Sequence, residues 1–354
     1  MPDWTQSMQV YFEYYLVDPV TWKDTKMLTF VKSANVQRDL NADTLGSATI
    51  EMDEKIDENY IRIYLVTIQN GITEKTTIGT YIVQTPNKKF DGLVSTYSMN
   101  AYTPLIELKE TKPPLGYTIF KDYNAMDIVK DLTSEHLRAP VLDVADTYNM
   151  YSNFTSDPED TWLTYLKNVM AYAEYSFMLD PEGRVGFIKN SNPDFSKPKW
   201  IFTDDNSSIL YPSITVSQDI YGMPNVLELV YTSSGGSIYT CRVVNDDPNS
   251  PISTINRGRE IVHRELNPQI PNTMSEEQVE LYAKELLASM SKLEYTITFD
   301  HGYCPVTIGD YILINYTRAG LRNISAKVIT QSITCDTECK IQTTASYYQK
   351  LWGN

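Results

Sequence analysis

Three histidines are the first side chains to test for chemistry, because an imidazole can act as a general base or a metal ligand near neutral pH. They are His136, His263 and His301. No two of them have the His-x-x-x-His spacing of a zinc hydrolase, and the sequence has no Gly-x-Ser-x-Gly nucleophile motif. His136 closes an expected helix, where a cation near the free carbonyl groups is favourable. The histidines therefore give no support to a hydrolase.

Adjacent acidic residues could supply the two carboxylates of a glycosidase, but those carboxylates must face each other across a cleft. Sequence neighbours on a loop do not converge in this way. Asp204-Asp205 and Asp246-Asp247 are therefore expected to lie in solvated turns. The third pair opens an expected helix, whose dipole favours negative charge. The calcium-loop pattern of alternating Asp or Asn with a central Gly and a final Glu is also missing. The pairs are Asp204-Asp205, Asp246-Asp247 and Glu276-Glu277.

The cysteines and the one Gly-rich segment do not form a recognisable metal or cofactor site. Cys335 and Cys339 are four residues apart, but tetrahedral zinc needs a second Cys or His pair nearby. Cys241 and Cys304 lie far from them in sequence, and such scattered cysteines are typical of reduced thiols made in a cytoplasm. Ser234-Gly235-Gly236-Ser237 indicates a hairpin turn, since no helix follows it to bind a phosphate. We therefore predict no catalytic residue, no cofactor and no metal.

Length and composition predict a folded protein of several units. The 354 residues exceed one average domain, so two to four compact units are expected. No apolar run approaches the ~18 residues of a membrane span, and residues 1–10 lack the pattern of a secretory signal. The net charge is −15 and there is no Lys/Arg run, so no surface for gripping nucleic acid is predicted. If the protein lined a channel, an acidic wall would keep a passing DNA strand from sticking.

Tyrosine is the unusual feature of the composition, with 26 Tyr against 10 Phe. Tyrosine favours half-buried strands. It is also enriched at protein interfaces, where one end of the ring is apolar and the other is wet. Abundant strand and large subunit contacts both explain the surplus.

A first β-barrel domain is expected over residues 1–108. Residues 60–68 alternate between two faces, and Asn70-Gly71 after them is a strong hairpin signal. Residues 78–84 follow and are expected to end at Pro86. Such regular spacing indicates a closed or sandwiched antiparallel domain. The other strands are expected at 8–17, 28–31, 48–52 and 94–101.

An α+β middle domain is expected over residues 109–205. Asn124 is predicted to cap one helix, and Asp157 with Pro158 to open a second. Asp180-Pro181-Glu182-Gly183 is a turn signal between two short strands.

The last third of the sequence returns to strands. A second, discontinuous β domain is expected over residues 206–245 and 294–354, with a loop and helix insertion at 246–293. Ser275 and Gln278 predict a capping box at the start of that helix. The order of elements indicates two β units with a smaller unit between or inside them. The strands are expected at 214–216, 226–231, 238–244, 295–299, 311–316, 324–333 and 341–347.

Short motifs spread along the chain occur in an order that resembles a known family. The first, Val36-Gln37-Arg38-Asp39-Leu40 with Leu45-Gly46-Ser47-Ala48, resembles an early strand-turn-strand of that family. The others are Gly79-Thr80-Tyr81-Ile82-Val83-Gln84-Thr85-Pro86 with Asp91-Gly92 and residues 97–105, Trp162-Leu163 with residues 175–183, Pro224-Asn225-Val226, Asn245-Asp246-Asp247-Pro248, Ser250-Pro251 and Gly258-Arg259. Together these segments resemble the hub proteins of phage tails. That family includes baseplate hubs of contractile phages and the N-terminal part of tail-associated lysins.

The resemblance implies a fold and a way of assembling. The fold is mainly β with α+β insertions, in which two tube-like antiparallel β-barrels accompany a mixed middle domain. A homotrimer then presents six barrels and adapts the six-fold tail tube to a three-fold spike or fibre. The implied partners are the tail tube or distal tail protein, a central spike, fibre or lysin, and the tape measure protein. DNA would pass through the lumen without specific binding.

The hypothesis is therefore a structural, non-enzymatic hub at the tail tip or baseplate of a virion, made in the host cytoplasm. The sequence ends at Asn354 without a lysin domain, so no cell-wall-degrading activity is expected. Two alternatives stay open. The first is a tail-tip protein that binds host carbohydrate, and the second is a cell-wall glycan hydrolase. No interaction residues are assigned from the sequence.

Overall fold

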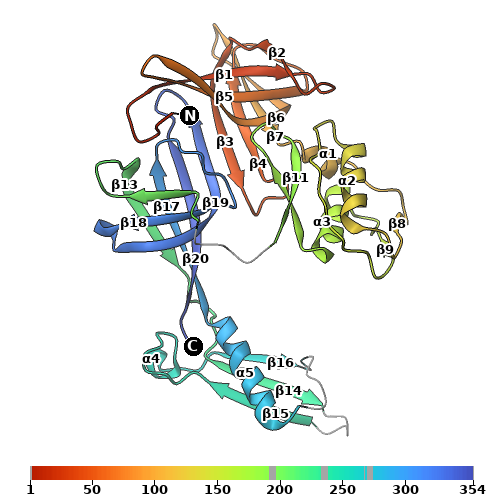
Figure 1. Cartoon of the computed structure of the whole chain (residues 1–354), viewed down its shortest axis with the longest axis vertical. Helices are drawn as coiled ribbons and strands as arrows, with labels where there is room; N and C mark the ends of the chain where they lie inside the picture. The colour runs from red at the N-terminus through yellow and green to blue at the C-terminus, as the bar shows by residue number, and fades with distance from the viewer. Residues whose placement is uncertain (1, 191–196, 233–237, 267, 269–273, 354) are drawn as a thin grey trace. The chain divides into compact units, whose positions relative to one another are not determined.

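The structure is a computed structural model that describes residues 2–190, 197–232, 238–266, 268 and 274–353 (Figure 1). Strands make up most of its regular structure, so the mainly β fold expected from the sequence is confirmed. The chain divides into a larger part, Met1–Ile214 with Phe299–Ala345, and a smaller part, Thr215–Thr298 with Ser346–Asn354. We describe each part by itself. The turn expected at Ser234-Gly235-Gly236-Ser237 lies outside the described residues.

Seven antiparallel strands form the first β region of the larger part. They follow the order β3-β4-β7-β6-β5-β1-β2 across the sheet. Successive side chains of a strand point to opposite faces, and in β4 every second residue from Gly46 to Met52 is buried. The strands are β1 (Gln9–Val17), β2 (Asp24–Met27), β3 (Val31–Asp39), β4 (Gly46–Met52), β5 (Asn59–Gln69), β6 (Ile72–Phe90) and β7 (Ser95–Tyr102).

The strand expected at residues 28–31 is wrong. Leu28 to Phe30 form the turn between β2 and β3, and the N–H of Leu28 donates to the carbonyl of Tyr14. Leu28 is buried in the core although it lies in the turn, so its apolar side chain does not indicate a strand. The true strand is β3, which the family resemblance implied only from Val36 onward. Its own apolar pattern is weak, because only Ala34 and Val36 are buried along it. Short apolar runs are ambiguous in this way.

The expected end of a strand at Pro86 is also wrong, since β6 continues to Phe90. The pairing of β6 with β5 ends at Val83, opposite Asn59. From Pro86 onward β6 pairs only with β7. One edge of the strand is therefore free of ladder partners there, and proline, which lacks an N–H, is tolerated at such an edge.

A second β region continues the sheet. Three of its strands, β13, β17 and β20, have residues in both parts of the chain. The sheet order continues β3-β19-β20-β17-β13, and β18 joins β19 on one side and β12 on the other. The β12–β18 pairing is parallel. The elements are β12 (Trp200–Thr203), β13 (Leu210–Gln218), β17 (Lys292–His301), β18 (Tyr311–Tyr316), the 3-10 helix η1 (Thr317–Ala319), β19 (Leu321–Cys335) and β20 (Ile341–Lys350).

The pairing of β3 with β19 joins the two β regions into one sheet. Its register runs from Asp39 opposite Thr330 to Ala34 opposite Cys335. The other edge of β3 pairs with β4, so both edges of this strand are occupied. The hydrophobic core of the first β region accordingly includes Ile333 and Ile341. The sequence did not predict this pairing.

The α+β segment of the larger part contains three helices, the hairpin β10–β11 and the short antiparallel pair of β8 with β9. Asn124 caps α2 as predicted, since its side-chain oxygen accepts the N–H groups of Met126 and Asp127. The predicted cap of the next helix is wrong. Thr161, rather than Asp157, accepts the N–H of Thr164 at the start of α3. The elements are α1 (Ile106–Glu110), β8 (Thr118–Ile119), α2 (Ala125–His136), β9 (Phe154–Thr155), α3 (Trp162–Tyr172), β10 (Tyr175–Leu179) and β11 (Val185–Lys189).

The smaller part has its own sheet and core. Its strands β14 (Val226–Thr232), β15 (Ile238–Val244) and β16 (Val262–Leu266) follow the order β15-β14-β16. The expectation that residues 226–244 belong to the second β region is therefore a misassignment. Both edges of β14 are paired inside this sheet, and Leu227 and Leu229 pack with Val279 and Leu287. The remaining domain boundaries expected from the sequence stay predictions.

Two helices complete the smaller part. The helix α5 (Glu276–Met290) begins with the predicted capping box, in which Ser275 and Gln278 bond each other's backbone. The short helix α4 (Thr254–Arg257) and β16 both lie inside the segment expected to be a loop.

A buried arginine fastens the β10–β11 turn to the first β region. Arg62 is only 5% exposed, and its guanidinium donates to Asp24 at 2.8 Å and to Thr80 at 3.0 Å. The carbonyl of Glu182, in the turn, accepts bonds from Arg62, from Thr80 and from the indole N–H of Trp22. A buried cation is stable only when its donors are satisfied in this way. The α+β segment and the first β region are therefore held together by one polar cluster.

Replacing Arg62 should destabilise the larger part strongly. The Arg62→Gln change leaves Asp24, Thr80 and the Glu182 carbonyl without the charged partner, and breaking a buried pair costs about 3 kcal/mol. Arg318→Gln is the matched control, because that side chain is 77% exposed and its pair with Asp204 spans 3.9 Å. We expect less than about 1 kcal/mol for the control. Chemical denaturation measures both, and equal effects would contradict the role of Arg62.

Candidate functional site

The three histidines do not share a site. His136 ends α2, as expected, and stacks on Trp162 with ring centroids 4.3 Å apart. His263 lies 3.3 Å from Glu265 on β16, with its side chain 42% exposed. His301 is fully buried. None of them contacts a serine hydroxyl that could act as a nucleophile among the described residues.

The acidic pairs do not converge on a cleft. Asp204 accepts from Thr317 and from the backbone of Arg318, and these bonds hold the pKa of its carboxyl below the usual value. Asp205 accepts from Ser207 within a turn, which likewise lowers its pKa. Asp247 accepts the N–H of Asn249 in a turn. Within the described ranges, no group of three or more His, Cys, Asp or Glu side chains is arranged to hold a metal ion.

A directed chain of hydrogen bonds crosses the joined sheet. The guanidinium of Arg38 on β3 donates to the side-chain oxygen of Gln331 on β19 at 3.0 Å. The amide of Gln331 reaches Thr343 Oγ1 on β20, and this hydroxyl lies 2.8 Å from His301 Nε2 on β17. Nδ1 of His301 lies 2.6 Å from the carbonyl of Gly302. A carbonyl only accepts, so Nδ1 carries the proton and Nε2 accepts from Thr343.

This chain of bonds requires a neutral His301. Burial among Phe202, Phe299 and the sheet lowers the pKa of His301 from 6.5 to about 4. Cys304 Sγ lies 3.9 Å from His301 Nδ1, which suggests a thiol–imidazole pair. Burial raises the pKa of the Cys304 thiol far above its usual value, however, so the sulfur stays protonated. The cluster is structural.

The other cysteines also lack reactive character. Cys335 and Cys339 are buried in the core of the first β region, and burial raises the pKa of Cys339 to about 12. The half-buried Cys241 of the smaller part has a raised pKa as well. A thiolate is the form that binds zinc or attacks a substrate, so these thiols are suited to packing.

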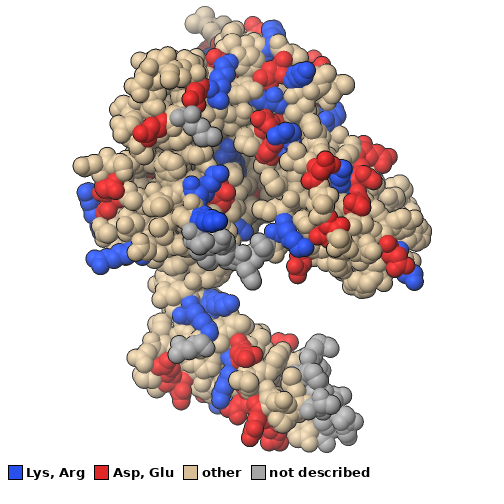
Figure 2. Space-filling view, in the orientation of Figure 1, with Lys and Arg blue, Asp and Glu red and all other residues tan. Residues whose placement is uncertain are grey.

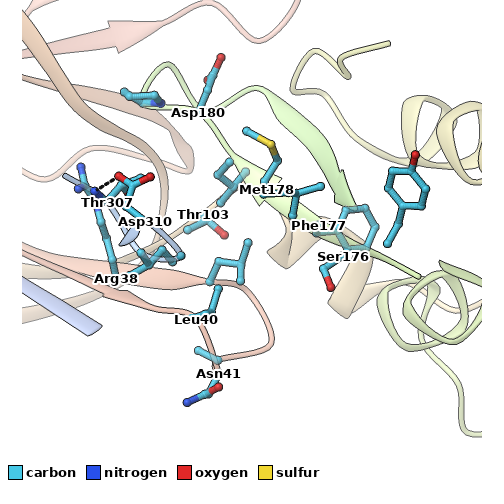
Figure 3. A pocket seen from close by; sticks show the side chains of 18 of the residues that line it. Arg38, Leu40, Asn41, Thr103, Ser176, Phe177, Met178, Asp180, Thr307 and Asp310 are labelled. Atoms are coloured by element: carbon cyan, nitrogen blue, oxygen red, sulfur yellow. Dashed lines mark hydrogen bonds between the residues drawn. The ribbon is translucent and has the colours of Figure 1, made fainter. Parts of the chain in front are cut away.

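One large cleft lies in the larger part, and we call it the central cleft. Its volume is about 830 Å³. The turn after β3, the hairpin β10–β11, the middle of β6 and the loop before β18 surround it (Figure 3). Its apolar lining includes Leu40, Met170, Phe177 and Met178. A cavity of this size and character fits a small molecule or several inserted side chains.

The charged groups of the central cleft are unevenly compensated. Asp310 accepts the N–H of Thr307 at 2.8 Å, and burial raises the pKa of its carboxyl. In the described part of the chain, Asp310 has no ion-pair partner. The guanidinium of Arg38 instead donates to Gln331 and to the carbonyl of Ile78. Lys167 and Lys189, by contrast, pair with Asp43 and Asp146. The cleft combines an apolar floor with a carboxylate that forms no direct ion pair among the described residues, although Lys199 and Arg38 lie near enough to act on its charge.

The lining of the central cleft shows no pair of side chains arranged as an acid and a base among the described residues. Asp180, another acid of the lining, pairs with Arg184 of its own turn. No histidine or cysteine lines the cleft among the described residues. The sequence analysis did not predict this cleft, because its lining comes from segments more than 250 residues apart, such as Leu40 and Asp310. No helix in the described ranges has the length and apolar character that crossing a membrane requires.

Comparison with known proteins identifies the fold. No protein-family model matches the sequence, and no curated protein is detectably similar in sequence. The structure is similar to a tail protein from Neisseria meningitidis MC58, with a TM-score of 0.62 and 12% identity over 97% of this chain and 98% of that one. It is also similar to the 43 kDa tail protein of prophage MuSo2 from Shewanella oneidensis, with a TM-score of 0.61 and 11% identity over 96% and 98%.

A third similar structure is part of a protein complex from Francisella. A chain of the Francisella PdpA–VgrG complex matches with a TM-score of 0.56 and 10% identity, over 99% of this chain and 60% of that one. At these identities the comparisons establish a shared fold. The resemblance to phage tail proteins seen in the sequence is therefore confirmed at the level of the fold.

The free energy of unfolding should decrease as the pH is lowered, because His301 is neutral in the folded state. Its folded-state pKa lies below the unfolded value, so protonation favours unfolding. The stabilisation is complete above about pH 6.5 and is lost as the pH falls toward 4, with about 2 kcal/mol lost by pH 5. The variant His301→Gln lacks this component, so its free-energy difference from the wild type should shrink by that amount between pH 7.5 and pH 5. His263→Gln is the exposed control, and the same shrinkage there would contradict the assignment.

Proposed function

We propose that this chain is a structural hub of a phage-type tail tip or baseplate and has no catalytic role. The observation that carries the proposal is the fold match over nearly the whole length of two tail proteins. A fold alone does not fix a function. The absence of a converging acid pair or an activated nucleophile in the described residues favours a structural role over a hydrolase.

The joined sheet supports the proposed adaptor role. Each chain holds two β regions at a fixed spacing, since β3 is hydrogen-bonded to β4 on one edge and β19 on the other. Three copies in a ring would present six β regions, which match a six-fold tail tube on one side and a three-fold spike, fibre or lysin on the other. A closed ring needs the same contact repeated between neighbouring copies.

Charge supports a lumen through which DNA passes without binding. The net charge is −15. Acidic and basic side chains are interspersed on the face shown in Figure 2, without a continuous basic track. A protein that grips nucleic acid needs such a track to release counter-ions. The proposed partners are therefore tail proteins, namely the tube or distal tail protein, the tape measure protein and the central spike, fibre or lysin, in a virion tail.

Carbohydrate binding is the second candidate, and a group of exposed aromatic rings favours it. Tyr123, Tyr151 and Tyr172 of the α+β segment are 56%, 70% and 40% exposed. Tyr151 and Tyr172 lie 5.9 Å apart, and the backbone of Tyr123 pairs with Met150. Exposed tyrosines present an apolar face and a hydroxyl together, which suits a sugar ring as well as a protein.

A glycan-binding assay separates the two candidates. We expect no saturable binding of bacterial surface glycans by the purified full chain, and no change in the Tyr151→Ala variant. Saturable binding that Tyr151→Ala abolishes would establish the carbohydrate function instead. Tyr221→Ala is the control, at a ring outside this group that is still more exposed (94%).

The hub proposal predicts a defined oligomer of the purified chain. Light scattering after size-exclusion chromatography should give a mass three times that of the 40.5 kDa chain. A ring requires a defined mass, because a contact repeated between identical copies closes into a ring only at a fixed number of copies. A monomer at every concentration tested would contradict the proposal.

A further inference from the structure

We propose that the tip of the β6–β7 hairpin of one copy inserts into the central cleft of a neighbouring copy. The inference rests on the proposed ring of identical chains and names the contact that builds it. By the tip we mean residues 88–94. The occupant of the cleft is thus a second copy of this chain.

The tip projects beyond the rest of the sheet. The last β5 partner of β6 is Asn59, opposite Val83. The hairpin nevertheless continues to Phe90, which pairs with Ser95. The turn itself is well defined, because the carboxylate of Asp91 accepts the N–H groups of Leu93 and Val94. The tip is therefore a shaped projection.

Apolar side chains are exposed at the tip. Leu93 is 93% exposed, Phe90 is 64% exposed and Val94 is 52% exposed. Single exposed apolar residues are ordinary on a protein surface, but three within five positions at the end of a projecting hairpin mark a site of interaction. Burying such anchors in a pocket supplies most of the affinity of a typical interface.

The central cleft has the complementary chemistry. Its volume of about 830 Å³ and its floor of Leu40, Phe177 and Met178 can take several apolar side chains. Asp310 is near Arg38 and Lys199, which act on its charge, but among the described residues it forms no ion pair with either. Lys89, in the tip, likewise forms no ion pair within the described part of its own copy. Pairing Lys89 with Asp310 across the contact would add an ion pair that neither side chain forms within its own copy. Size, apolar character and charge therefore favour the tip as the occupant.

Tip and cleft cannot meet within one molecule. Tyr81 of β6 lines the cleft, while Phe90 ends the same strand nine residues later. At about 3.3 Å per residue the two ends are about 30 Å apart. A contact between opposite ends of one hairpin must therefore join different copies. It is a heterologous contact, the type that closes into a ring when the rotation between copies is a simple fraction of a turn.

Changing the tip tests this contact in the full chain. The double variant Phe90→Asp and Leu93→Asp should lower the mass measured by light scattering from the oligomer to the 40.5 kDa monomer. Val20→Asp is the matched control, because Val20 is 90% exposed but lies outside the tip. The control should keep the oligomer. Unfolding midpoints measured for all variants confirm that loss of assembly is not loss of folding.

A covalent cross-link tests the same contact without weakening it. Leu93→Cys with Met178→Cys should form disulfide-linked multimers on oxidation, since a disulfide needs Cα atoms closer than about 7 Å. The background is Cys241→Ser, because the other native cysteines are buried. Val20→Cys with Met178→Cys should give no multimer.

The outcomes separate this inference from the proposed function. An oligomer that survives the tip change and gives no cross-link would overturn the tip–cleft contact while leaving the ring intact. A tip change that instead abolishes binding to another tail protein, with the oligomer unchanged, would assign the tip to that partner and also overturn the inference. A wild-type chain that stays monomeric would contradict the ring itself.

Discussion

The structure depends on one strand pairing that spans almost the whole sequence. β3 near the N-terminus forms hydrogen bonds with β19 near the C-terminus, over the six positions from Asp39 opposite Thr330 to Ala34 opposite Cys335. Because its other edge is paired with β4, β3 has no free edge and the two β regions cannot separate without breaking the ladder. Bringing β3 and β19 together closes a loop of almost 300 residues, which lowers the entropy of the chain, and local contacts do not offset that loss. The shared core around Ile333 and Ile341 offsets that cost.

The same pairing creates the polar chain and the central cleft. Arg38 sits on β3 and reaches Gln331 on β19, so the directed bonds toward His301 exist only when the two strands are aligned. Arg38 and Asp310 line the cleft from the two β regions. The hairpin β10–β11 forms the opposite wall, and Arg62 holds its turn in place. Three distant segments thus form the site, and the buried Arg62, the half-buried Arg38 and the β3–β19 ladder position it.

The sequence predicted the elements that carry local signals and missed those that depend on distant partners. Asn70-Gly71, the Asn124 cap and the Ser275 capping box were identified because each satisfies backbone groups within a few residues. β16 was not predicted, because its sequence is polar and its strand conformation depends on its pairing with β14. The cleft could not be predicted, because nothing in Arg38 or Asp310 alone reveals that β3 and the loop before β18 are neighbours. The family resemblance supplied the fold class through motif order.

The central claim is that two joined β regions per chain assemble three at a time around a lumen. Electron cryo-microscopy of the purified oligomer tests it most directly. The account predicts a three-fold ring in which every copy contributes both β regions to the wall of the channel. A map with another symmetry, or one in which only a single β region of each chain borders the channel, would contradict it.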